Sequence, residues 1–180
     1  MAKSLQQIVE ENKMLLITSE ISDNELSQII TDLMRWSNED PKQEIKIFLS
    51  SECYEFLNII TIYDVLKKIP NPISVNAIGV VGGLSMLFIA AANKGKRYML
   101  KNTIVCFSQP LGNINSGANQ QTEVEIEARN TTLMRKEIEE IYAEAFDKPI
   151  EEIHDLVEAG KSFKAEEAKE YGLIDVIVGE

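Results

Sequence analysis

Residues 74–97 constrain the fold more than any other part of the chain. Residues 74–81 are rich in β-branched and apolar side chains and predict one buried strand, whereas residues 84–92 are rich in Ala, Leu and Met and predict a buried helix. Gly82 and Gly83 lie between them. A strand that turns sharply into a helix exposes backbone N–H groups, an arrangement that enzymes use to hold a nucleophile and stabilise an oxyanion. Residues 74–97 therefore predict the backbone arrangement of a catalytic site.

Strand-like and helix-like segments alternate along the rest of the chain. Strands are expected at residues 13–17, 44–49, 97–100, 103–107 and 173–178, and helical segments at 4–12, 22–36, 56–69, 149–158 and 165–171. Residues 50–55 are expected to form a loop. This alternation favours an α/β domain with a largely parallel sheet.

Residues 122–146 predict the longest helix. Thr122 and Glu125 have the spacing of a capping box, and Met134, Ile138 and Tyr142 fall on one apolar stripe. A helix of this length extends beyond a globule of 180 residues, so it is expected to pack on a partner or to project as an arm.

The acidic composition excludes several classes of function. The chain has 18 basic and 29 acidic side chains and a net charge of −11, which disfavours binding to nucleic acid or to an anionic membrane surface. No apolar run reaches the roughly 18 residues of a membrane span, and the start lacks the apolar centre of a signal peptide. Cys53 and Cys106 have no metal-ligand spacing and indicate a reducing compartment. We therefore expect a soluble protein without metal or cofactor.

Four motifs then carry a resemblance to a known family: Lys94–Arg97, Ser108–Gly112, Glu125–Arg129 and Ala165–Asp175. In order and spacing they resemble the proteolytic subunit of the Clp protease, ClpP, from about Lys13 to the C-terminus, with a short insertion near residues 113–117. The resemblance implies the ClpP/crotonase fold in a single domain over residues 1–180. Its head of stacked βαβ units would comprise residues 13–112 and 147–180, and its handle helix residues 122–146.

The resemblance also implies an assembly. In this family the handles interlock two heptameric rings, the rings enclose a Ser-His-Asp triad, and an AAA+ unfoldase delivers substrates. The expected partners are therefore further copies of the chain in a heptameric ring, a catalytic ClpP paralogue and an AAA+ Clp unfoldase.

The family's catalytic positions hold other residues here. The serine position falls on Gly83, the histidine position on Ser108 and the aspartate position on Gly160. Glycine carries no nucleophile, and a serine hydroxyl cannot act as a general base near neutral pH. The resemblance is therefore to the non-catalytic R-type paralogues (ClpR) found in plastids and cyanobacteria.

The family's oxyanion loop is altered as well. Where the family has Asn-Ser-Pro-Gly-Gly, this chain has Ser-Ser-Glu-Cys-Tyr, ending in Glu52, Cys53 and Tyr54. A carboxylate and a bulky ring thus enter a region that should stabilise an anion.

Two other functions stay open. Ser85 matches half of a Gly-x-Ser-x-Gly elbow, so one alternative is an active serine endopeptidase with a rearranged site on Ser85. The single histidine, His154, does not form a dyad with Asp155, because neighbouring residues on a helix point apart. The other alternative is an acyl-CoA-binding, crotonase-like protein, although it too would need oxyanion donors, one of them in the altered loop.

The resemblance also places the family's aromatic docking residues for the unfoldase. The corresponding positions are Lys46, Phe48 and Lys68, of which Phe48 alone stays aromatic. Because a charged group weakens an apolar anchor, we expect altered docking. The high frequency of isoleucine fits an AT-rich genome such as that of an apicomplexan parasite, which favours a plastid (apicoplast) stroma over a bacterial cytoplasm.

Overall fold

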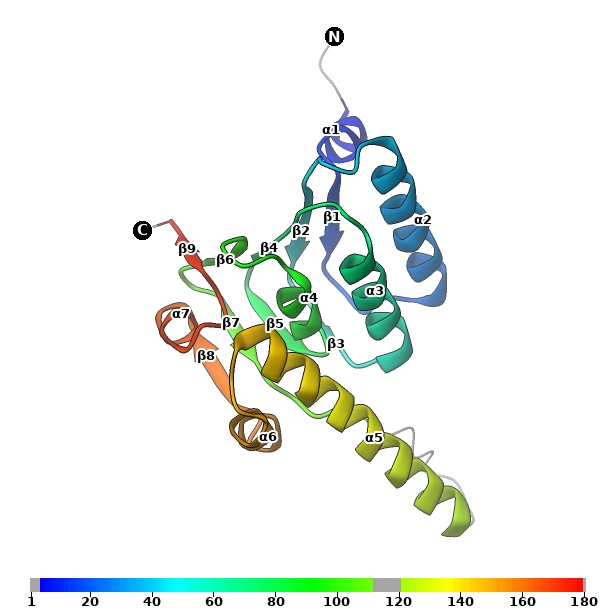
Figure 1. The fold of residues 1–180 in the computed structure, drawn as a ribbon, viewed down its shortest axis with the longest axis vertical. Helices are drawn as coiled ribbons and strands as arrows, with labels where there is room; N and C mark the ends of the chain where they lie inside the picture. The colour runs from blue at the N-terminus through cyan, green and yellow to red at the C-terminus, as the bar shows by residue number, and fades with distance from the viewer. Residues whose placement is uncertain (1–3, 112–120, 180) are drawn as a thin grey trace.

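The computed structural model describes residues 4–111 and 121–179 and contains two sheets, covering helices and one long projecting helix (Figure 1). The larger sheet has five parallel strands in the order β1-β2-β4-β6-β9. These strands are β1 (Met14–Ile17), β2 (Ile45–Leu49), β4 (Ile73–Ala77), β6 (Arg97–Leu100) and β9 (Val176–Val178).

The smaller sheet has four strands in the order β3-β5-β7-β8. They are β3 (Glu52–Cys53), β5 (Val80–Gly83), β7 (Ile104–Cys106) and β8 (Ser162–Lys164). The β3–β5 and β5–β7 pairs are parallel, and β8 returns antiparallel to β7.

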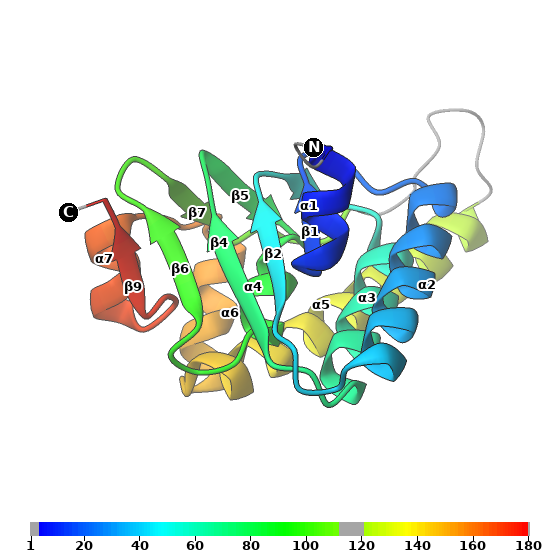
Figure 2. The same cartoon turned by 90° about the horizontal axis from the view of Figure 1, so that it is seen from above.

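The helices are α1 (Leu5–Glu11), α2 (Asp23–Glu39), α3 (Phe56–Lys68), α4 (Met86–Ala91), α5 (Gln121–Phe146), α6 (Ile150–Glu158) and α7 (Ala165–Tyr171). Figure 2 shows α2, α3 and α4 on one side of the larger sheet, whereas α1 lies on the other side near β1 and β2. Helix α5 corresponds to the predicted long helix and projects away from both sheets (Figure 1). Among the described residues, no helix has the length and apolarity to cross a bilayer.

The two faces of the larger sheet differ in burial. One row across the sheet is buried beneath the helices, with the paired residues Ile17, Leu49, Ala77, Met99 and Ile177. The next row faces the opposite way, because side chains alternate along a strand, and all of its members are half-buried or exposed: Leu16, Phe48, Asn76, Tyr98 and Val176. The sheet thus presents one partly uncovered face.

An ion pair between buried Arg97 and half-buried Asp175 joins β6 to the turn before β9. The Asp175 carboxylate accepts hydrogen bonds from Arg97 Nε at 2.9 Å and from the backbone N–H groups of Gly95 and Arg97 at 2.8 and 2.9 Å. Burial alone would raise the pKa of Asp175, but these hydrogen bonds and the Arg97 charge outweigh it and lower the pKa. The first and last of the four sequence motifs therefore have a structural role.

Several predicted boundaries were wrong. Residues 74–81 form two strands in different sheets, because the chain turns at Gly79, where φ is +67°, between β4 and β5. The loop expected at residues 50–55 contains β3, and β8 was not predicted at all. Helix α5 begins at Gln121, so Thr122 lies inside the helix and is not its N-cap.

Candidate functional site

The smaller sheet brings together the three positions predicted from the family's triad. Continuing the β5–β7 register places Gly83 next to Phe107, and continuing the β7–β8 register places Ser108 opposite Gly160. The Phe107 N–H donates to the Lys161 carbonyl at 2.9 Å, which extends that pairing towards Ser108. Ser108 is half-buried and Gly160 is exposed. Positions far apart in sequence therefore meet at one edge of this sheet.

Gly83 has no room for a side chain. Its φ of +57° lies in the left-handed region that other residues rarely adopt. Strand β3 pairs beside it, and an added Cβ would lie under 3.0 Å from the Cys53 carbonyl oxygen and 3.2 Å from Tyr54 Cε1. The backbone oxygen cannot move without breaking the β3–β5 pairing. This position therefore excludes any nucleophilic side chain.

The backbone N–H groups around Gly83 already have acceptors inside the protein. The Leu84 N–H donates to the Cys53 carbonyl at 2.7 Å, and the Cys53 N–H donates to Ser85 Oγ at 3.1 Å. An oxyanion hole needs N–H groups that point at the substrate oxygen. Using these two groups for that purpose would require breaking two internal hydrogen bonds, one of them fully buried.

The side chain of Glu52 lies against Gly82, with which Glu52 pairs across β3 and β5. A Cβ added to Gly82 would come within 2.9 Å of Glu52 Oε1 and 3.1 Å of its Cγ. A carboxylate at this place repels a developing negative charge. Glu52 thus places a carboxylate next to Gly82, one residue before Gly83.

Ser85 and His154 lie in separate environments. Ser85 is fully buried, and its hydroxyl accepts the hydrogen bond from Cys53. His154, on α6, has Nδ1 3.1 Å from an oxygen of Glu139 on α5, whose carboxylate is also 3.5 Å from Arg135 Nε. Sequence reasoning missed the Glu139 contact, because the two residues are 15 apart and meet only where α6 packs on α5.

The described residues contain no cluster of three or more His, Cys, Asp or Glu side chains able to hold a metal ion. Cys53 is buried with its Sγ 3.0 Å from Ser51 Oγ, and Cys106 is half-buried.

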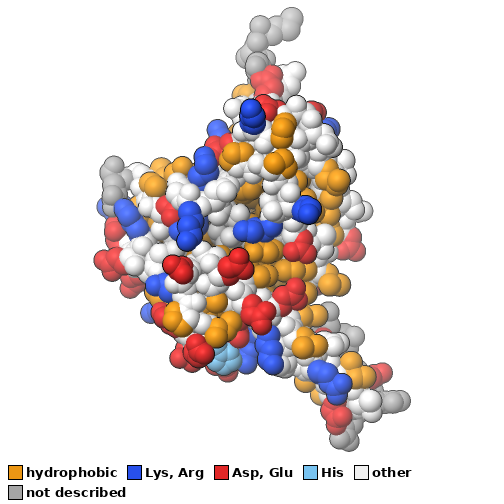
Figure 3. All heavy atoms as spheres, viewed as in Figure 1, with side chains coloured by type: hydrophobic (Ala, Val, Ile, Leu, Met, Phe, Trp, Pro, Cys, Tyr) orange, Lys and Arg blue, Asp and Glu red, His pale blue; other side chains and the backbone are white. Residues whose placement is uncertain are grey.

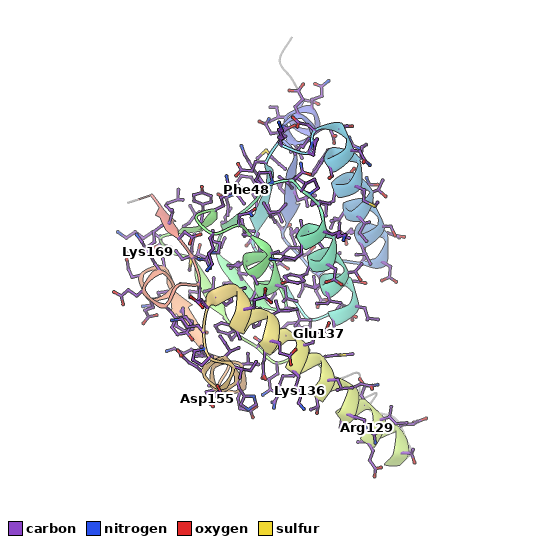
Figure 4. All side chains as sticks on the ribbon, in the orientation of Figure 1. Phe48, Arg129, Lys136, Glu137, Asp155 and Lys169 are labelled. Atoms are coloured by element: carbon purple, nitrogen blue, oxygen red, sulfur yellow. The ribbon has the colours of Figure 1, made fainter. Side chains whose placement is uncertain are left out.

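Of the predicted docking positions, Phe48 lines a cavity. This cavity of about 310 Å³ lies on the partly uncovered face of the larger sheet, between α1 and the strands, with Ile8, Val9 and Leu16 among its other lining residues. Figure 4 shows Phe48 on this part of the molecule, away from α5 and α6. Lys46 is half-buried on the same strand, and Lys68 is exposed at the last residue of α3.

Comparison with family models matches the whole chain, residues 1–180, to the family described as Clp protease. The parallel sheets and the long helix α5 are consistent with the expected ClpP/crotonase fold.

Proposed function

Because the chain belongs to the Clp protease family, we propose that it is a non-catalytic, ClpR-type subunit that forms rings within a Clp-type ATP-dependent protease complex. The observation that carries this proposal is the closed environment of Gly83. The Cys53 carbonyl occupies the space that a nucleophilic side chain would need. With Ser108 and Gly160 at the other two positions, the site holds neither a nucleophile nor a general base.

The hydrogen bonding of the same region supports the proposal. Both N–H groups that would face an oxyanion, those of Cys53 and Leu84, have internal acceptors. This also counts against an acyl-CoA-binding, crotonase-like function, which would depend on the same pair of donors.

The environment of Ser85 counts against an active endopeptidase built on that residue. Its hydroxyl is buried and accepts a hydrogen bond from Cys53, whereas His154 is bound to Glu139 on α5. A serine becomes a nucleophile when a general base lies within hydrogen-bond distance, and the structure shows no such contact between Ser85 and His154 in the described part of the chain.

Two surfaces support ring formation. Parallel sheets are normally covered on both faces, so the row of Leu16, Tyr98 and Val176 is suited to contact another copy of the chain. The projecting helix α5 carries the exposed apolar side chains Ile126 and Leu133, and Figure 3 shows hydrophobic side chains along it. In this proposal the head uses the sheet face within a ring, and the handle α5 contacts a second ring or a catalytic ClpP paralogue.

The proposal extends to the unfoldase and the compartment. Phe48 lies in the same row as Leu16, so an AAA+ Clp unfoldase anchored on Phe48 would share this face with the neighbouring copy in the ring, while Lys46 and Lys68 would weaken docking. The two free cysteines fit a reducing compartment, for which we propose a plastid or apicoplast stroma.

The experiment is native mass spectrometry of the chain alone and with a catalytic ClpP paralogue, with peptidase activity and fluorophosphonate labelling measured on the same samples. We expect an inert heptamer that joins the active paralogue and is not labelled. A monomer in both samples would contradict ring formation. Cleavage by the chain alone that Ser85→Ala abolishes would contradict the non-catalytic assignment.

A further inference from the structure

A further cavity lies where α3, α4 and α5 meet. It has a volume of about 350 Å³ and is lined by Tyr63 and Lys67 of α3, by Ala90–Lys94 at the end of α4, and by Glu144 and Ala145 of α5. Figure 2 shows these three helices on the side of the larger sheet opposite to α1. The volume exceeds the roughly 300 Å³ at which small-molecule sites begin. We call it the Tyr63–Lys94 cavity.

Two lysines give this cavity its charge. Lys67 and Lys94 are both exposed, and in the described part of the chain neither ammonium group has a carboxylate within ion-pair distance. Among the lining residues that the structure describes, Glu144 is the one carboxylate. Positive groups therefore outnumber negative ones here, although the chain as a whole carries a net charge of −11.

Neutral hydrogen-bond donors line the same cavity. Asn93 Oδ1 accepts the Ile73 N–H at 2.6 Å, which orients the amide, and within the described residues Asn93 Nδ2 has no acceptor. Tyr63 is half-buried, and its burial, followed by the charges of Glu144 and Asp64, raises the pKa of its phenol, so the hydroxyl keeps its proton. A helix dipole favours a lysine such as Lys67 in the last turn of α3, but it does not account for these two neutral donors.

The donors come from different elements, and this indicates the shape of the ligand. Tyr63 and Lys67 lie on α3, whereas Asn93 and Lys94 lie in the turn after α4. A tetrahedral phosphate group presents oxygens in several directions, and a lysine ammonium binds it as a point charge. A planar carboxylate offers only two oxygens. The alanines of the lining, Ala90, Ala91, Ala92 and Ala145, leave room beside these donors.

From these features together, we propose that the Tyr63–Lys94 cavity binds a phosphate group, either as inorganic phosphate or as part of a small organic phosphate. Lys67 and Lys94 neutralise its charge, and Asn93 Nδ2 and the Tyr63 hydroxyl donate to its oxygens. An organic part would lie on the alanines. The proposal goes beyond the proposed function and does not depend on it, because none of these residues belongs to the closed site.

The test is isothermal titration calorimetry at constant ionic strength with three probes: inorganic phosphate, phenyl phosphate and benzoate. We expect both phosphates to bind, and benzoate to bind at least about fivefold more weakly than phenyl phosphate. Lys67→Gln should weaken phosphate binding about tenfold or more, because a charged donor is lost. Asn93→Asp should weaken it at least as much, since it keeps the acceptor for the Ile73 N–H but replaces the donor with a negative charge.

The matched control is Lys68→Gln, because Lys68 is also an exposed lysine in the last turn of α3 but does not line the cavity. It removes the same charge and should change the affinity less than about twofold. Binding that follows this pattern supports the proposal, and the phosphate that binds more tightly shows whether the ligand is inorganic or organic. No binding of either phosphate up to about 10 mM, equal affinity for benzoate and phenyl phosphate, or equal losses in Lys67→Gln and Lys68→Gln would overturn it.

Discussion

Around Gly83 the protein fills its own space, whereas across β1, β2, β4, β6 and β9 it leaves a row of apolar side chains partly uncovered. The Cys53 backbone both blocks the space beside Gly83 and accepts the Leu84 N–H. On the larger sheet, by contrast, Leu16 is 59% exposed. The comparison shows that backbone atoms fill the space beside Gly83, whereas the larger sheet keeps a partly uncovered apolar row.

Placing a serine at position 83 tests the first half of the comparison and should have the largest effect. Gly83→Ser should lower the free energy of unfolding by about 3 kcal/mol or more, since it adds both left-handed strain and a clash with Cys53. It should restore no peptidase activity. Denaturant unfolding and a fluorogenic peptide measure the two effects.

The control is Gly95→Ser, because Gly95 has a similar positive φ of +84° but no atom within 4 Å of an added Cβ. It should lower the free energy of unfolding only by the backbone strain, roughly 1 to 2 kcal/mol. A stable and active Gly83→Ser protein would show that the site is open.

The stability of the larger sheet depends on the Arg97–Asp175 ion pair. Asp175→Asn should destabilise the fold by about 2 kcal/mol or more at neutral pH, because it leaves the buried Arg97 charge without its carboxylate partner. The folded pKa of Asp175 lies below its unfolded value, so its contribution is present above about pH 4 and is lost as pH falls through the folded pKa. Unfolding curves against pH should therefore converge for wild type and variant in acid. If the wild-type and variant curves stayed parallel as the pH falls, the ionised Asp175 carboxylate would not be what stabilises the fold.

The uncovered face is tested by a matched pair of substitutions. Leu16→Asp should raise the concentration needed for self-assembly by about tenfold or more, because it places a charge in the contact. Met34→Asp should not, although Met34 is similarly exposed at 55% on the outer side of α2. Light scattering over a dilution series measures the concentration at which each variant assembles. Equal effects would indicate that assembly uses another surface.

The smallest expected effect is at Ser85. Ser85→Ala should cost about 1 to 2 kcal/mol, because the buried Cys53 N–H loses its acceptor. Fluorophosphonate labelling should be absent before and after the change. Ser27→Ala on the exposed side of α2 is the control and should stay within about 0.5 kcal/mol. Labelling that depends on Ser85 would reopen the endopeptidase alternative.

Much of the architecture followed from local patterns. The alternation of strands and helices, the long helix and the missing side chain at Gly83 are all visible in the chain. The division of residues 74–81 was not, because β4 and β5 are both apolar and only two residues separate them. The short strands β3 and β8 were missed for a similar reason, since two or three residues are too few for a periodic pattern.

The sequence by itself determined that position 83 has no nucleophile and that position 108 has no base, because side-chain chemistry is a local property. Only the tertiary structure decided that Gly83 is closed, that the Cys53 and Leu84 N–H groups are already used, and that His154 meets Glu139. These facts depend on which strand lies beside which and how α6 packs on α5. Such long-range pairing places atoms within hydrogen-bond distance although no local spacing in the chain connects them.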